Sequence, residues 1–213
     1  MPLGPPLRRR FYARDARDVG PALIGCRLVH RLPGGIRLVV RLTEVEAYLG
    51  DGSDPASHAH PGPTPRNGAM FGPAGRLYAY RSYGIHTCVN VVCEVAGRGA
   101  AVLLRAAEPL EGLDAMRRLR GLGADAPPHR LTVGPGRLGQ ALGLTLADDG
   151  RSLLGGALRI HPPPGASAPV GASPRVGITK AADLPYRYFE IDAKDRPTRW
   201  VSAFRRGGRR RPA

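Results

Sequence analysis

The sequence has few cysteines, few aromatic residues and no long apolar run. Its three cysteines form no Cys-x-x-Cys pair, so a disulfide framework and a structural zinc site are poorly supported, and a reducing compartment is expected. No apolar stretch approaches the roughly 18 residues of a membrane-spanning helix. The basic N-terminus is not followed by the apolar segment of a signal peptide. We therefore expect an intracellular protein with no membrane association.

Acidic residues are also scarce. Lys and Arg number 32 against 17 Asp and Glu, a formal net charge of +15, and almost all of the cations are arginines. Such an excess indicates a polyanionic partner, with nucleic acid as the leading class; a codon bias toward Arg, Ala, Gly and Pro is the alternative. The length of 213 residues fits one domain with a substantial core. We expect a basic flexible arm over residues 1–10, a domain over 11–203 and a basic tail over 204–213.

Alternation of apolar and polar residues predicts several strands. Residues 26–32 and 36–45 have the pattern of a hairpin turning at Pro33-Gly34-Gly35, and residues 86–95 and 100–107 have that of another. Further strands are expected over residues 77–83, 157–161, 175–179 and 186–192.

Three helices are expected between these strands. The first follows Asp15 as its N-cap, and the third follows Gly134-Pro135-Gly136. The second starts at Glu108-Pro109, with a core stripe of Leu110, Leu113, Met116 and Leu119. Residues 121–133 have the composition of a linker. Hairpins alternating with a few helices favour an α+β fold, a single compact domain with a curved antiparallel β-sheet and flanking helices, over a doubly wound parallel sheet.

Two glutamates near the end of the 36–45 strand are candidates for chemistry. If the strand's alternation continues, Glu44 and Glu46 share the face of Leu42. A carboxylate on an apolar face is costly unless it is satisfied or used, so Glu46 is the leading candidate for a base that deprotonates water. A strand-end glutamate paired with an arginine is the structural alternative. Glu44 fits an ion pair equally well.

Residues 50–75 form a long Pro- and Gly-rich loop, which is unusual in a compact domain unless it is functional. Its His58 and His60 are candidates to hydrogen-bond a substrate, and metal binding with Cys88 and Cys93 is the weaker reading. The tyrosines around the loop suit either a core or the stacking of bases, and Asn90 needs a buried partner or reads a base edge. These tyrosines are Tyr48, Tyr78, Tyr80 and Tyr83, the last at a strand tip suited to a wedge into a duplex.

Several ordered segments carry a family resemblance. They are residues 43–50 (TEVEAYLG), 57–67 (SHAHPGPTPRN), 70–92 (MFGPAGRLYAYRSYGIHTCVNVV), 101–112 (AVLLRAAEPLEG) and 134–144 (GPGRLGQALGL), with 175–181 (RVGITKA) and 200–202 (WVS) near the C-terminus. Together they resemble the alkyladenine (3-methyladenine) DNA glycosylase family. The resemblance covers nearly the whole chain outside its two basic ends.

The resemblance implies a monofunctional enzyme of base excision repair, which flips a damaged purine out of double-stranded DNA and hydrolyses its N-glycosidic bond to leave an abasic site. Glu46 matches the family's catalytic glutamate, which activates water, and Arg105 matches an arginine beside that water. The residues matching the base pocket are Tyr48, Tyr80, His58 and Asn90, the first two as aromatics that sandwich the base and Asn90 as a barrier to normal guanine. Tyr83 matches the wedge residue, and Ile85 flanks it.

The resemblance implies no cofactor and no metal. The expected state is a monomer that in a bacterium is cytoplasmic and nucleoid-associated. The absence of lysine from residues 41–105 fits water as the nucleophile and argues against a Schiff-base lyase. Three alternatives stay open: His60 in the place of His58, a non-catalytic nucleic-acid-binding module on the same fold, and an unrelated metal-dependent hydrolase. The range of lesions, whether alkylpurines alone or also hypoxanthine and ethenoadenine, is open as well.

Overall fold

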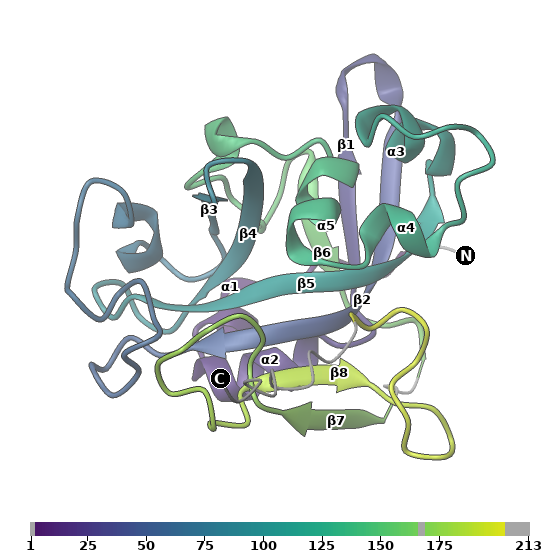
Figure 1. The fold of residues 1–213 in the computed structure, drawn as a ribbon. Helices are drawn as coiled ribbons and strands as arrows, with labels where there is room; N and C mark the ends of the chain where they lie inside the picture. Colours follow the sequence, from purple (N-terminus) through teal and green to yellow (C-terminus); the bar gives the residue numbers. More distant parts are fainter. Residues whose placement is uncertain (1–2, 166–168, 203–213) are drawn as a thin grey trace, which may run out of the picture.

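Two long antiparallel strands, β2 (Arg37–Tyr48) and β5 (Ala100–Glu111), form the centre of the sheet in a computed structural model that describes residues 3–165 and 169–202 (Figure 1). Beyond β5 lie β4 (His86–Cys93) and then β3 (Leu77–Ser82); beyond β2 lie β1 (Arg27–Arg31) and then β6 (Leu158–His161). The β1–β2 and β4–β5 hairpins are confirmed. All of the strand pairs are antiparallel.

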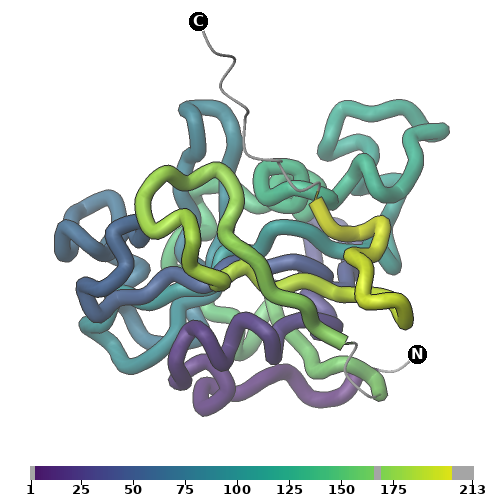
Figure 2. Tube along the Cα trace, turned by 60° about the horizontal axis from the view of Figure 1, so that its bottom comes forward, coloured from purple at the N-terminus to yellow at the C-terminus, as the bar shows by residue number. Residues whose placement is uncertain are grey.

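The strand β2 has different neighbours along its two halves. Its first residues pair with β1, whereas Glu44, Val45 and Glu46 pair with β8 (Arg187–Glu190), which in turn pairs with β7 (Val170–Ser173). The sheet curls around this branch point into a half-barrel. In Figure 2 the yellow-green segment after β7 arches across the near side of the central strands. This architecture confirms the expected α+β class with a curved antiparallel sheet.

Short helices flank the sheet, and their bounds follow from local sequence. The Asp15 side chain accepts a hydrogen bond from the Arg17 amide and so caps the second helix, as expected. The α-helices are α1 (Arg9–Tyr12), α2 (Ala16–Leu23), α3 (Leu113–Leu119), α4 (His129–Thr132) and α5 (Pro135–Ala141), and the 3₁₀ turns are η1 (Pro33–Gly35), η2 (Gly68–Phe71) and η3 (Leu146–Asp148). None of the helices in the described part of the chain is long and apolar enough to cross a membrane.

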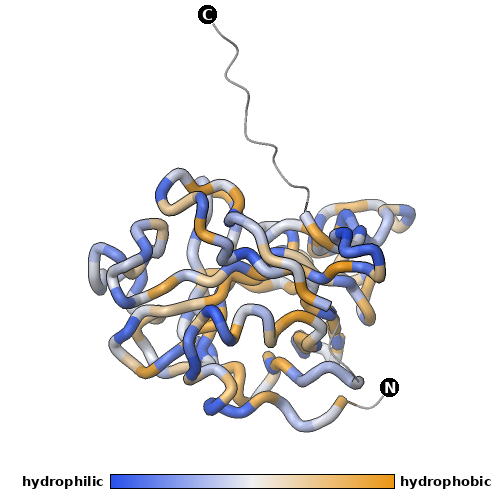
Figure 3. Tube along the Cα trace, turned by 90° about the horizontal axis from the view of Figure 1, so that it is seen from below, coloured by the Kyte–Doolittle hydropathy of each residue, from blue (hydrophilic) through white to orange (hydrophobic). Residues whose placement is uncertain are grey.

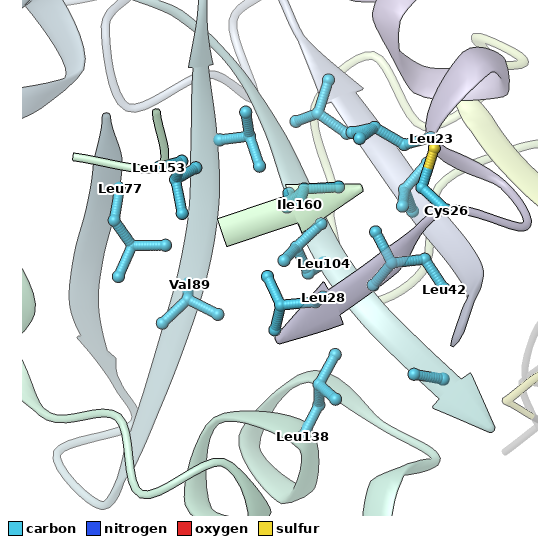
Figure 4. Packing of buried hydrophobic residues seen from close by; sticks show 14 of the residues in the cluster. Leu23, Cys26, Leu28, Leu42, Leu77, Val89, Leu104, Leu138, Leu153 and Ile160 are labelled. Carbon is cyan, nitrogen blue, oxygen red and sulfur yellow. The ribbon is translucent and has the colours of Figure 1, made fainter. Parts of the chain in front are cut away.

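One apolar core lies between the concave sheet and its helices. Figure 4 shows Leu138 of α5 directed toward Leu28 of β1 and Leu104 of β5. Hydrophobic residues follow the central strands in Figure 3, and hydrophilic ones follow the outer loops. Burial of such side chains contributes roughly 1.5–3 kcal/mol each. The helices α2 and α5 thus hold the strands that carry the candidate site residues.

Three expectations about secondary structure are wrong. The second predicted helix begins at Leu113 and not at Glu108-Pro109, because β5 continues to Glu111 and Pro109 pairs with Val40 beside a register shift, where a missing N–H is tolerated. Leu110 is therefore exposed and lies outside the core stripe. Residues 175–179 form a loop, in which Arg175 bonds to Asp54 and the Val176 amide donates to Glu46. The 121–133 linker contains α4.

The two chain ends were expected to lie outside the domain. At the N-terminal side, the Leu7 amide donates to the Ile160 carbonyl over 2.8 Å, and α1 begins at Arg9. The boundary at residue 11 stays a prediction. The expected tail over 204–213 lies outside the described residues.

The contact between α5 and β4 depends on glycine. A Cβ at Gly139 would lie 2.3 Å from the Thr87 carbonyl oxygen, whereas a Cβ at Gly155 would meet nothing within 4 Å. We expect Gly139→Ala to lower the free energy of unfolding by about 1–3 kcal/mol, the usual cost of forced overpacking. Gly155→Ala is the matched control. Urea unfolding followed by circular dichroism measures both, and equal stabilities would contradict the close approach.

Candidate active site

A bulge in β2 turns both candidate glutamates away from the core. The pairing of β2 with β5 shifts register between Leu42 and Glu44 and again before Val45, and a one-residue shift reverses the face on which side chains lie. Leu42 and Val45 both pack in the main core, so Glu44 and Glu46 lie on the opposite face. The expectation that they share the face of Leu42 is therefore wrong. Both side chains are nevertheless fully buried, with 0% exposure.

Glu44 is the centre of a buried ionic network. Its Oε1 accepts hydrogen bonds from Arg105 Nε and Arg187 Nε, both over 2.8 Å, and from Ser202 Oγ over 2.7 Å. Its Oε2 accepts from the Ser202 amide over 2.6 Å. Burial alone raises the pKa of Glu44, but Arg105 and Arg187 outweigh that effect, and the net shift is downward. Glu44 is thus a saturated carboxylate with a structural position.

Glu46 has fewer partners. Its Oε2 accepts from the Tyr48 hydroxyl over 2.9 Å and from Arg105 Nη1 over 3.2 Å, and its Oε1 accepts from the Val176 amide over 2.7 Å. Arg105 therefore bridges the two glutamates. Burial and the charge of Glu46 together raise the pKa of Tyr48 well above its usual value, which keeps the phenol protonated as a donor.

A chamber of about 170 Å³ lies beside this network. Its polar and aromatic lining includes Tyr48, His58, Tyr80 and Asn90, the four residues predicted for the base pocket. The lining also contains Ala56, Met70, Tyr78, Gly177 and Ile178. Asn90 Nδ2 donates to the Tyr78 carbonyl over 3.1 Å, and this hydrogen bond gives the buried amide the partner that it needs. The structure brings these predicted residues together; their roles stay predictions.

His58 lies at the mouth of the chamber. Its Nδ1 is 2.9 Å from the Tyr78 hydroxyl, and its ring packs edge-on to Tyr80 with centroids 4.6 Å apart. Partial desolvation and, secondarily, the charge of Arg66 lower the pKa of His58, which favours the neutral imidazole. His58 also lines the outer hollow described next, whereas His60 lines neither.

An outer hollow of about 590 Å³ adjoins the chamber and shares Ala56, His58, Tyr78 and Tyr80 with it. Its cations are Arg66, Arg81 and Lys180, and the tip of the β3–β4 hairpin forms one wall. At that tip Tyr83 is 85% exposed and Ile85 is 73% exposed. Tyr83 and Gly84 both have positive φ, at 49° and 69°, a conformation that costs a non-glycine residue about 1–2 kcal/mol. An aromatic side chain held outward at such cost is typical of a functional position.

Residues far from the predicted set complete the site. Arg175 forms a fully buried two-bond pair with Asp54, at 2.6 and 2.8 Å. Its guanidinium lies 4.6 Å from the centre of the Tyr48 ring and donates to the Ala47 carbonyl. This pair fixes the segment that presents the Val176 amide to Glu46. Neither residue is among the predicted site residues, although the RVGITKA segment contains Arg175.

The alternative of a metal site has little geometric support. Among residues 3–165 and 169–202, no group of three or more His, Cys, Asp or Glu side chains is arranged to hold a metal ion. His60 is exposed, and Cys88 and Cys93 are free and buried on β4.

The ionic network predicts how stability depends on pH. Because the folded pKa of Glu44 is depressed, its contribution is present above the unfolded pKa of about 4.3 and is lost as pH falls through the folded pKa. Glu44→Gln, which leaves two buried arginines without their carboxylate, should lower stability at pH 7 by about 3–5 kcal/mol and flatten the loss below about pH 5.

The control is Glu111→Gln, which breaks a half-exposed pair with Arg37 and should cost less than about 1 kcal/mol. Urea unfolding at several pH values measures both variants. Equal losses at pH 7 would contradict the structural position of Glu44.

Comparisons with known proteins agree with this geometry. The family model described as methylpurine-DNA glycosylase (MPG) matches residues 10–194. A relative from Rhodopseudomonas palustris is 52% identical over 192 residues, covering 90% of this chain and 88% of its own. Another, from Methanoculleus marisnigri, is 49% identical over 183 residues, covering 84% of this chain and 92% of its own. Both carry the name "Putative 3-methyladenine DNA glycosylase". The chain therefore belongs to the methylpurine-DNA glycosylase family, whose members are hydrolases of N-glycosyl bonds.

Proposed function

We propose that this glycosylase flips a damaged purine out of duplex DNA into the chamber and hydrolyses its N-glycosidic bond with a water that Glu46 activates, leaving an abasic site. The observation that carries the proposal is the position of Glu46, a fully buried carboxylate joined by a hydrogen bond to Tyr48 in the chamber wall. The alkylated purines are the substrates that we infer, in line with the name of the relatives.

The chamber suits one flat heterocycle. Its volume of about 170 Å³ is smaller than the roughly 300–1,000 Å³ of sites for drug-sized ligands. Tyr48 and Tyr80 offer aromatic faces, and a purine alkylated at N3 or N7 is a cation, which such faces attract. The neutral imidazole of His58 can hydrogen-bond the base without adding a repelling charge.

Glu46 retains a free acceptor site. An ionised carboxylate offers about four lone-pair sites, and three are occupied by the donors on Tyr48, Arg105 and Val176. The fourth is available to take a proton from water. An alkylated cationic base leaves as a neutral molecule, so the reaction needs little acid catalysis. A placed water and a carboxylate that stabilises an oxocarbenium-like sugar are sufficient.

In this proposal the tip of the β3–β4 hairpin opens the duplex. Flipping a base costs a few kcal/mol, least for damaged or mismatched pairs. Tyr83, with Ile85 beside it, would fill the gap that the flipped base leaves. Arg66, Arg81 and Lys180 in the outer hollow would contact phosphates with no sequence preference. One chamber suffices for one lesion, so we propose that the protein acts as a monomer, associated with the nucleoid if its source is bacterial.

Glu46→Gln tests the proposed chemistry. The amide keeps the size of the side chain but cannot accept a proton. The rate of base release should therefore fall by about 10²–10⁴-fold, the contribution of a general base, and the affinity for DNA should be retained. Alkaline cleavage of methylated DNA, and of duplexes with one hypoxanthine or ethenoadenine, measures release and ranks these lesions. Glu111→Gln controls for loss of a carboxylate. Full activity in Glu46→Gln would remove Glu46 from the chemistry, whereas no release by the wild type, with DNA binding intact, would favour the non-catalytic binding module.

Asn90→Ala tests discrimination at the chamber floor. Asn90 is buried, and its amide is held by the Tyr78 carbonyl, so it would clash with the 2-amino group of guanine. Truncation should raise release of 7-methylguanine relative to 3-methyladenine, as measured by chromatography of bases freed from methylated DNA. Thr87→Ala on the same strand is the control. An unchanged ratio of the two bases would remove Asn90 from specificity.

A further inference from the structure

The helices α3 and α4 both contact α5, which packs against β4 (Figure 1). Three arginines of this region lie close enough for the charges of Arg130 and Arg137 to act on Arg120. Arg120 directly follows α3 as its C-cap, Arg130 lies in α4 and Arg137 lies in α5. Within residues 3–165 and 169–202, no carboxylate forms an ion pair with any of them. Arg117 of α3, by contrast, pairs with Asp114.

The positive charge of this cluster is uncompensated. Arg120 is half-buried, donates from Nη1 to the Gln140 side chain, and has an Nε without a hydrogen-bond partner. Burial lowers the pKa of Arg120, and the charges of Arg137 and Arg130 lower it further. Like charges held together without a counterion favour the binding of an anion.

Two glycines fix the cluster relative to the Tyr83–Ile85 tip. A Cβ at Gly136 would lie 2.7 Å from the Cβ of His86, and one at Gly139 would lie 2.3 Å from the Thr87 carbonyl. The helix α5 therefore contacts the first residues of β4 directly. A hollow of about 370 Å³ lies at this contact, lined by Ile85, His86, Thr87, Gly136, Gln140 and Leu144. Arg120 reaches its edge through Gln140.

The hairpin consequently separates two hollows. Ser82 and Tyr83 face the outer hollow that leads to the chamber, and Ile85 and His86 face the hollow beside α5. A duplex into which the tip inserts therefore also lies against the α5 side of the hairpin. Guanidinium groups match phosphate oxygens in two-bond geometry, and a net charge of +15 makes nucleic acid the complementary partner.

We propose that Arg120, Arg130 and Arg137 bind phosphates of the duplex on the side of the β3–β4 hairpin away from the chamber. The tip is then held in the DNA from both sides. This inference rests on the proposed function, since it takes DNA as the substrate, but it concerns backbone binding and needs no base release.

The test is the salt dependence of binding to a labelled undamaged duplex, followed by fluorescence anisotropy. Arg130→Ala/Arg137→Ala removes two exposed cations. Arg76→Ala/Lys194→Ala is the charge-matched control, with Arg76 at the opposite end of β3 from the tip and Lys194 in the turn after β8. Each lost phosphate contact should reduce the slope of log K against log salt by about 0.9. Between about 50 and 200 mM salt, the double variant should therefore lose about tenfold less affinity than the wild type.

The control should keep the wild-type slope, and circular dichroism should show both double variants folded. Arg137→Glu supplies a second variant and should weaken binding further at low salt. Equal slopes in the two double variants would overturn the inference. The outcome is separable from that of Glu46→Gln, because undamaged DNA is not cleaved: a failed excision assay leaves the slope interpretable, and an unchanged slope leaves the excision result standing.

Discussion

The structure depends on two fully buried carboxylates, Glu44 and Glu46, that share one arginine. Glu44 receives four hydrogen bonds, from Arg105, Arg187 and Ser202, and this arrangement joins the centre of the sheet to its last strand. Burying an ion costs several kcal/mol unless hydrogen bonds and opposite charges replace the lost hydration. The same arginine, Arg105, reaches Glu46. Glu44, whose acceptor sites are occupied, therefore orients the Arg105 guanidinium, which in turn bonds to Glu46. Glu46 has fewer donors than Glu44, and this difference separates the structural role of Glu44 from the chemical role proposed for Glu46.

Local patterns in the sequence predict much of the fold. The hairpins around Pro33-Gly34-Gly35 and residues 96–99 follow from alternation and turn residues, and α2 follows from its cap. Tyr48, Tyr78, Tyr80, His58 and Asn90 come from one short region of the sequence and line one chamber, and Glu46 is hydrogen-bonded to its wall. The choice between His58 and His60 needed the loop's conformation, which places only His58 in the lining.

Long-range pairing accounts for what the sequence did not predict. The face of Glu44 depends on a bulge set by the partner strand β5, which strict alternation within β2 ignores. Arg175 is 121 residues from Asp54, and Arg187 is 143 from Glu44; neither spacing leaves a periodic signal. The segment 175–179 has a strand-like sequence but forms a loop, in which Ile178 lines the chamber while the Val176 amide and the Arg175 guanidinium bond to Glu46 and Asp54.

The segment that covers Glu46 is translated after the strand that carries it. The glutamates lie in β2, but the Val176 amide, Arg187 and Ser202 that complete their shell come from the end of the described chain. During synthesis a growing chain emerges N-terminal part first. The donors on Val176, Arg187 and Ser202 are therefore the last parts of the shell around the two acids to be translated. Completion of the donor shell around the two glutamates therefore depends on the last residues that the structure describes, so a chain shortened before them would keep both acids and lose the groups that enclose them.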